Sequence, residues 1–388
     1  MAEIKNFDKY RKKKTHKKFF IRLLIFIIIC SIGFSIYIFR KSPFISSVKN
    51  FFTNGIIELK KGDGYPVYLP GGTSLDLKND GNDVILLTDT DLIFYNSTGL
   101  LIRQIKHGAE NPKIDTANNK VLVFDRGGKT ISVESKTKTL FSKTCDKKII
   151  TASISDNGYV AVVTESGRYM SELTVYDIDR DNQIFAWWTT EQTICDVDFS
   201  NDNKKIAVAS IGTSNGQIAS SITSFYLDSE QPSFKVDFID TLIINVTFKD
   251  KNNITAIGDN KLISINSEGA VLNQADFSNE EFIGYTNPKG KYSVLLLKDF
   301  TRNNNYFVRI FDSYGKLIAE KSYSEEIDKV SCDNSRVIAS SQKTLKVIDM
   351  TGKELSSIDT DTAIYKVIQT GSDAYVLGTD KILSFSLK

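Results

Sequence analysis

The sequence contains few of the residues from which catalytic and metal sites are usually built. Only two histidines occur among its 388 residues, His16 and His107, which excludes a metal site with several histidine ligands. A Ser-His-Asp triad beyond the N-terminal tail would have to use His107, which is expected to be a solvated turn residue. No glycine-rich phosphate loop precedes a predicted helix. These absences predict that the protein is not an enzyme and holds no metal ion and no cofactor.

Proline is also scarce, and charge is distributed unevenly. Six prolines and 23 glycines leave little scope for long low-complexity linkers. Residues 1–22 contain nine lysines and arginines against two acidic residues, a net charge of +7, although the whole chain carries only +2. The rest of the chain therefore carries a net charge of −5. A body of this sign is a poor match for nucleic acid, and no nucleic-acid partner is predicted.

One apolar run near the N-terminus predicts a single transmembrane helix. Residues 23–39 contain no charged side chain, and a helix over residues 19–39 would be about 31 Å long, enough to cross the hydrocarbon core. The run is long for a signal peptide, and no small-residue cleavage site follows it. A lipoprotein signal at Cys30 is the alternative, but Ile29 stands where such signals carry a small residue.

The charges that flank this run predict its orientation. Five lysines precede it closely, whereas Arg40, Lys41 and Lys49 follow it. The positive-inside rule places the basic tail, residues 1–18, in the cytoplasm and everything after the span outside. The expected localisation is the cell membrane, with a single-pass type II topology and a juxtamembrane linker over residues 40–64.

From about residue 56 onward the chain consists of short apolar or alternating segments bounded by Asn, Asp, Gly or Ser, a pattern that predicts an all-β protein. Two turn motifs recur. One separates the first and second strands of a unit, as in residues 153–163 and 199–209. The other contains glycine and separates the third and fourth strands, in residues 93–102, 263–272, 309–318 and 346–355. Glycine supplies the positive φ that a tight hairpin needs.

These turns divide the chain into eight units. First strands are expected to begin near residues 74, 111, 149, 193, 242, 281, 327 and 363. The repeat of roughly 39 residues is typical of a four-stranded propeller blade. The last unit, residues 363–388, has three strands, and the segment 65–69 is expected to supply its outer strand. The predicted fold is an eight-bladed β-propeller over residues 65–388, with seven blades as the alternative if the weak unit 111–148 is miscounted.

The recurring turns resemble those of the WD-repeat and quinoprotein-like propeller superfamilies, although the Trp-Asp dipeptide and a repeated blade tryptophan are absent. A basic tail, one span and a propeller outside the membrane together resemble a bacterial family of uncharacterised membrane-anchored propeller proteins. The resemblance implies the architecture and says nothing about chemistry.

The longest connections all fall between the second and third strands of a blade, at residues 165–172, 210–221 and 298–306. In an antiparallel blade these connections share one face with the links between blades, and they are expected to project together away from the membrane. Long loops often carry function, although drift in tolerant surface loops is the alternative. The candidate binding residues in these loops are Arg168, Tyr169, Met170, Asn215, Gln217, Arg302, Asn303, Asn304, Asn305 and Tyr306.

Trp187 and Trp188 are adjacent on the predicted outer strand of blade three. Neighbouring strand residues point to opposite faces, so one tryptophan is expected to pack against an adjacent blade, and the other is a candidate contact for protein or glycan.

The acidic run 177–182 resembles the start of a calcium loop but lacks its later glycine and glutamate, and is expected to be a turn. Three cysteines beyond the span, Cys145, Cys195 and Cys332, are expected to be free buried thiols, with one disulfide as the alternative.

Together these features predict an extracytoplasmic propeller that acts as a binding scaffold or sensor for an envelope protein or cell-wall polymer. The alternative is a propeller-type hydrolase or lyase acting on cell-surface glycan or a small lactone-like substrate. Converging acids at the central channel would favour catalysis, whereas an exposed aromatic patch would favour binding.

Overall fold

The computed structural model describes residues 61–299, 301 and 305–387. The predicted cytoplasmic tail, the predicted span over residues 19–39 and most of the linker lie outside these residues, as do Arg302, Asn303 and Asn304. Within the described ranges, no helix has the length and apolar character needed to cross a membrane.

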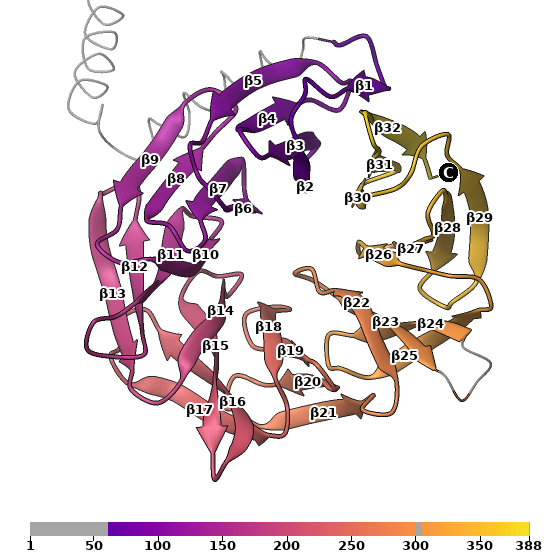
Figure 1. The fold of residues 1–388 in the computed structure, drawn as a ribbon. Helices are drawn as coiled ribbons and strands as arrows, with labels where there is room; N and C mark the ends of the chain where they lie inside the picture. Colours follow the sequence, from indigo (N-terminus) through magenta and orange to yellow (C-terminus); the bar gives the residue numbers. More distant parts are fainter. Residues whose placement is uncertain (1–60, 300, 302–304, 388) are drawn as a thin grey trace, which may run out of the picture. The chain divides into compact units, whose positions relative to one another are not determined.

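The described chain forms eight four-stranded antiparallel sheets arranged as the blades of a ring (Figure 1). In each blade we name the strands A to D from the centre outward. The strands of blades one and two are β2 (Ser74–Asp80), β3 (Asp83–Thr88), β4 (Asp91–Tyr95), β5 (Leu101–Lys106), β6 (Pro112–Ala117), β7 (Lys120–Asp125), β8 (Thr130–Glu134) and β9 (Thr139–Thr144). Blades three and four contain β10 (Ile149–Ile154), β11 (Tyr159–Glu165), β12 (Ser171–Asp177), β13 (Asn182–Thr189), β14 (Thr193–Phe199), β15 (Lys205–Ser214), β16 (Gln217–Tyr226) and β17 (Pro232–Ile239).

The second half of the ring repeats this plan. Blades five and six contain β18 (Ile243–Phe248), β19 (Ile254–Gly258), β20 (Lys261–Ile265), β21 (Val271–Asp276), β22 (Glu281–Thr286), β23 (Tyr292–Asp299), β24 (Asn305–Asp312) and β25 (Leu317–Tyr323). Blades seven and eight contain β26 (Lys329–Cys332), β27 (Arg336–Ser340), β28 (Thr344–Asp349), β29 (Glu354–Asp359), β30 (Lys366–Thr370), β31 (Asp373–Leu377), β32 (Lys381–Ser386) and, from the start of the domain, β1 (Val67–Tyr68). The prediction of eight blades is confirmed, and the seven-bladed alternative is wrong because residues 112–144 form a complete blade.

Blade eight closes the ring by joining the two ends of the domain. Its outer strand β1 pairs antiparallel with β32, with Val67 opposite Ile382 and Tyr68 opposite Lys381. The ring of Tyr65 packs on Tyr375 of the same blade, with 5.1 Å between the ring centroids. Figure 1 shows the first and last blades side by side.

The hydrophobic core consists of eight separate clusters, one between each pair of neighbouring blades. The cluster between blades three and four, for example, joins Val163 and Val175 to Ile206 and Phe225. The B and C strands are apolar on both sides because each sheet is covered by a blade on either face; all six residues of β3 are buried. The ring is therefore held together by the interfaces between blades.

Glycines at the C–D turns allow consecutive blades to approach closely. Gly269 has a φ of 85°, and a Cβ atom there would lie 2.8 Å from the Cβ of Phe234 in the preceding blade. Gly315 has a φ of 74°, and its Cβ would lie 2.9 Å from the Cβ of Ser264. The recurring turn glycine thus serves both the backbone conformation and the packing between blades.

Alternation of strand direction puts the B–C turns and the links between blades on one face of the ring, which we call the BC face. The A–B and C–D turns lie on the other, the AB face. All three long connections predicted from the sequence are B–C connections. The prediction of a loop over residues 210–221 is nevertheless wrong, because β15 and β16 extend until only Asn215 and Gly216 separate them. Both residues have positive φ, as an Asn-Gly hairpin turn requires.

Candidate functional site

A cavity of about 760 Å³ lies at the centre of the ring. It is lined by the inner strands of blades one to six and by charged side chains of both signs. These charged residues are Lys78, Lys113, Arg126, Lys289, Asp115, Asp156, Asp196 and Asp198. This gathering of charges is not apparent from the sequence, because its members come from several different blades. Its one visible signal is the pair of aspartates within the otherwise apolar strand β14.

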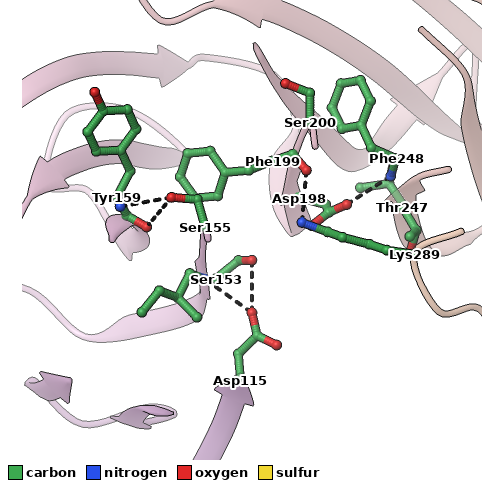
Figure 2. A network of polar contacts seen from close by, with 12 residues as sticks. Asp115, Ser153, Ser155, Tyr159, Asp198, Phe199, Ser200, Thr247, Phe248 and Lys289 are labelled. Carbon is green, nitrogen blue, oxygen red and sulfur yellow. Dashed lines mark hydrogen bonds and ion pairs between the residues drawn. The ribbon is translucent and has the colours of Figure 1, made fainter. Parts of the chain in front are cut away.

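Asp115, on β6 of blade two, is bound to both neighbouring blades, and Figure 2 shows its contact with Ser153 of blade three. Its Oδ2 accepts hydrogen bonds from the Ser153 hydroxyl at 3.0 Å and from the Ile154 N–H at 3.1 Å. On the other side, the Lys78 ammonium lies 3.4 Å from Oδ1. Burial alone would raise the pKa of Asp115, but Lys78 and these hydrogen bonds lower it below its usual value.

Asp198, on β14, connects three blades (Figure 2). Its Oδ2 accepts the N–H of Phe248 in blade five at 2.8 Å. Lys289 reaches it from blade six, with 3.2 Å between Nζ and Oδ1, and also donates to the carbonyl oxygen of Phe199 at 3.0 Å. Burial raises the pKa of Asp198, and the Lys289 charge opposes this effect.

Asp196, two residues earlier on the same strand, has no cation as a direct partner among the described residues. Its Oδ2 accepts hydrogen bonds from the Asn245 amide at 3.0 Å and from the Val246 N–H at 2.9 Å. Burial raises the pKa of Asp196 to about 7, and the negative charge of Asp198 adds to the effect. A carboxyl group with this pKa can exchange a proton near neutral pH.

Most of these polar groups are used to hold blades together. Beyond the aspartates, Lys366 of blade eight pairs with Asp76 of blade one at 2.8 Å. Lys249 of blade five donates to the carbonyl oxygens of Pro288 and Tyr292 in blade six, each at 2.8 Å, and burial lowers its pKa to about 7. The channel therefore contains converging acids, but each of the three aspartates already accepts hydrogen bonds from a neighbouring blade.

His107 and the serine motif of blade four do not form a hydrolase triad. The Nδ1 atom of His107 accepts the N–H of Ala109 at 3.1 Å, so the proton lies on Nε2, which faces the carbonyl oxygen of Thr88 at 3.1 Å. Residues 212–216 match the G-x-S-x-G pattern, but they lie at the tip of the β15–β16 hairpin, whereas a nucleophile elbow joins a strand to a helix. In the described ranges no group of three His, Cys, Asp or Glu residues is placed to hold a metal ion.

Two other sequence features have structural roles. Oδ1 of Asp177 accepts the N–H groups of Asp179 and Arg180, so the acidic run is a turn, as predicted. Cys145, Cys195 and Cys332 are free thiols, so the disulfide alternative is wrong. Cys145 and Cys332 are buried, whereas Cys195 is only partly buried.

On the outer edge of blade three, four predicted residues form a group that we call the aromatic cluster: Arg168, Tyr169, Met170 and Trp188. Tyr169 is partly buried, and the other three are exposed. The rings of Tyr169 and Trp188 lie 6.1 Å apart, and the Arg168 guanidinium carbon lies 5.4 Å from the Tyr169 ring centroid. Met170 is 50% exposed and Trp188 46%. The two segments are joined because the Met170 N–H donates to the carbonyl oxygen of Thr189.

Trp187 points to the other face of β13, where its ring lies 4.8 Å from that of Phe225 in blade four. One tryptophan thus packs between blades and the other is exposed, as the alternation along the strand predicts. The remaining described candidates lie on other blades. Asn215 and Gln217 lie at the tip of the blade-four hairpin, and Asn305 and Tyr306 begin β24 of blade six.

The fold and these two sites define an eight-bladed propeller with a polar channel and one exposed aromatic cluster. The chain belongs to the family of unknown function DUF5711, whose model matches residues 73–385. No curated protein matches it significantly in sequence. The propeller fold that the resemblance to known propeller superfamilies implied is confirmed.

Three solved structures illustrate that similarity. Sqt1 from Saccharomyces cerevisiae is 12% identical, with a TM-score of 0.62, covering 84% of this chain and 99% of that chain. BamB from Moraxella catarrhalis is 11% identical, with a TM-score of 0.53 and coverages of 82% and 95%. The β-propeller domain of Cps50 (Swd1) from Myceliophteria thermophila is 7% identical, with a TM-score of 0.53 and coverages of 84% and 100%. At these identities the similarity concerns the fold alone.

Proposed function

We propose that the protein is a membrane-anchored scaffold or sensor that binds an envelope protein through the BC face of its propeller, outside the cytoplasm. The observation that carries this proposal is the aromatic cluster of blade three. Tyrosine, tryptophan, methionine and arginine, the four residue types of this cluster, are among the side chains enriched in protein-binding surfaces. The propeller holds them on a rigid edge, which lowers the entropy that binding must overcome.

The apolar run over residues 19–39 and the lysines before it support the anchoring and the orientation. A membrane-impermeant amine-reactive biotin reagent, applied to intact cells, tests both. The propeller should be labelled in intact cells, and the N-terminal tail only after the cells are lysed. If only the tail were labelled in intact cells, the orientation in the membrane would be the opposite of the one proposed.

Binding is tested by crosslinking the tagged full-length protein in cells, followed by affinity capture and mass spectrometry. The Tyr169→Ala, Trp188→Ala double variant removes both rings of the aromatic cluster. The matched control is Tyr314→Ala, because Tyr314 is 52% exposed in a C–D turn on the AB face. A specific envelope protein should be captured by the wild type and the control and be lost from the double variant. Equal capture by all three proteins would refute the proposed surface, and capture of wall polymer instead of protein would change the ligand class.

A second candidate function is supported by Asp196, whose pKa of about 7 suits a general acid or base. In this hypothesis the channel hydrolyses or cleaves cell-surface glycan or a small lactone-like substrate. Purified wild type and Asp196→Asn protein would be compared on wall fragments and on a panel of lactones. Turnover by the wild type that disappears in Asp196→Asn, without loss of folding, would favour the enzyme. Absence of turnover in both would leave the scaffold as the better hypothesis.

A further inference from the structure

Six exposed cations extend across the BC face from the channel mouth to the aromatic cluster, and we call them the basic strip: Lys113, Arg126, Lys129, Lys147, Lys148 and Arg168. Lys113 and Arg126 line the central cavity. The other four lie in connections of blades two and three. None of the six forms an ion pair with a described residue.

Backbone hydrogen bonds join the segments of the strip into one continuous surface. The N–H of Gly127 donates to the carbonyl oxygen of Ile149 at 2.8 Å, and the N–H of Ile149 donates to Gly128 at 2.7 Å. The Glu165 N–H donates to the carbonyl oxygen of Lys148 at 2.9 Å. This bond joins the B–C connection of blade three to the link between blades two and three. The fixed backbone therefore holds these cations in a defined order.

The strip differs in charge from the equivalent surface elsewhere on the ring. Residues 126–129, 145–148 and 165–170 contain five cations and two carboxylates, a net charge of +3. The link between blades six and seven instead contains Glu325, Glu326 and Asp328, of which Glu325 pairs with Lys346 and Asp328 with Lys329. A negatively charged partner would therefore be attracted to blades two and three more strongly than to the opposite part of the face.

Resting on the proposed function, we propose that the BC face binds an acidic, extended peptide segment of a partner protein along the basic strip. An apolar side chain at one end of the segment packs on Met170 and Trp188, which are exposed beside the last cation. This combination favours a peptide over a uniformly charged polymer, because a polymer without apolar groups would leave both side chains uncovered. Arg168 belongs to both the basic strip and the aromatic cluster, since its guanidinium group faces the Tyr169 ring.

The test uses the full-length protein in detergent micelles and a fluorescent twelve-residue synthetic peptide with six glutamates followed by leucine and tryptophan. Fluorescence anisotropy measures its binding at several salt concentrations. The Lys147→Glu, Lys148→Glu variant should weaken binding by about tenfold or more at low salt and reduce the salt dependence. Lys251→Glu, Lys353→Glu makes the same change in charge on exposed residues of the AB face and should bind as the wild type does.

Three results would overturn the inference. One is unchanged affinity in Lys147→Glu, Lys148→Glu, and another is equal binding of a peptide with lysine in place of glutamate. The third is a combined result, in which polyglycerol phosphate displaces the peptide and Trp188→Ala binds the peptide with unchanged affinity. This result would identify an anionic polymer as the ligand. The cell capture experiment separates the two proposals. If the aromatic double variant loses the partner and the lysine variant keeps it, the scaffold stands and the acidic segment is refuted.

Discussion

Replacing Asp196 with asparagine is expected to stabilise the propeller at alkaline pH and to reduce the pH dependence of its stability. Burial raises the pKa of this carboxyl group from 3.8 to about 7. In the unfolded chain the proton is lost near pH 3.8, whereas the folded propeller keeps it until about pH 7. Because the unfolded state binds fewer protons between these values, native stability falls as the pH rises through this window and stays lowered above it.

The expected size of the effect follows from the same two pKa values. Their difference of about three corresponds to about 4 kcal/mol, an upper bound because Asp196 keeps part of its surface open to the channel. Between pH 5 and pH 8 the linkage relation gives about 2–3 kcal/mol. Asparagine stays neutral throughout, and its side-chain oxygen can still accept the Val246 N–H. The gain in unfolding free energy caused by Asp196→Asn should therefore be larger at pH 8 than at pH 5 by about this amount.

Urea unfolding of the full-length protein in detergent micelles, at pH 5 and pH 8, measures this difference. Trp187 emission is a suitable probe because its ring packs between two blades. Asp115→Asn is the control. The pKa of Asp115 is lowered, so its ionised form stabilises the fold above its usual pKa, and this stabilisation is lost only in acid. The control should be destabilised about equally at pH 5 and pH 8. The same gain for Asp196→Asn at both values would refute a strongly raised pKa.

Four further substitutions test how the blades are packed. Trp187→Ala should cost about 3 kcal/mol in urea unfolding because it leaves a cavity between blades, whereas Trp188→Ala should cost less than about 0.5 kcal/mol. His107→Ala should lower the free energy of unfolding by about 1–2 kcal/mol, because both ring nitrogens of His107 hydrogen-bond to backbone groups. Unchanged thermal stability would contradict that role. Gly269→Ala should lower the free energy of unfolding by about 1–3 kcal/mol, since residue 269 has positive φ and the added Cβ would collide with Phe234. A melting temperature equal to that of the wild type would show that the turn can relax.

The blade pattern could be predicted because it depends on local sequence. The C–D turns of blades one, five, six and seven each contain a glycine with positive φ, as at Gly269 and Gly315, so the same turn motif recurs in these four blades. The alternation that separates Trp187 from Trp188 is equally local. The wrong prediction of a loop over residues 210–221 has an equally local cause: Asn215-Gly216 is a strong signal for a two-residue hairpin, and this signal outweighs the length of the polar segment around it.

The channel and the basic strip could not be predicted in the same way. Asp115 and Asp198 are 83 residues apart in the sequence and meet the same cavity only because the blades form a ring. Nothing in the sequence around either aspartate indicates which backbone N–H it accepts from the next blade. The cations of the basic strip likewise come from separate connections, each with a composition common in surface turns. Such sites depend on contacts between residues that are distant in the chain, and the repeating pattern of the sequence does not reveal these contacts.

The closing pair of strands also has a consequence for the order in which the protein matures. β1 is made before all other strands of the propeller, and β32, its partner, is made after them. During synthesis, blades one to seven can form in turn, but β1 has no sheet to join until β32 has left the ribosome. The cluster between blades eight and one, which includes Ile382 and Tyr95, also waits for that moment. Until then the nascent ring has two uncovered blade faces, so the newly made protein is most exposed to aggregation and proteolysis just before its final strand arrives.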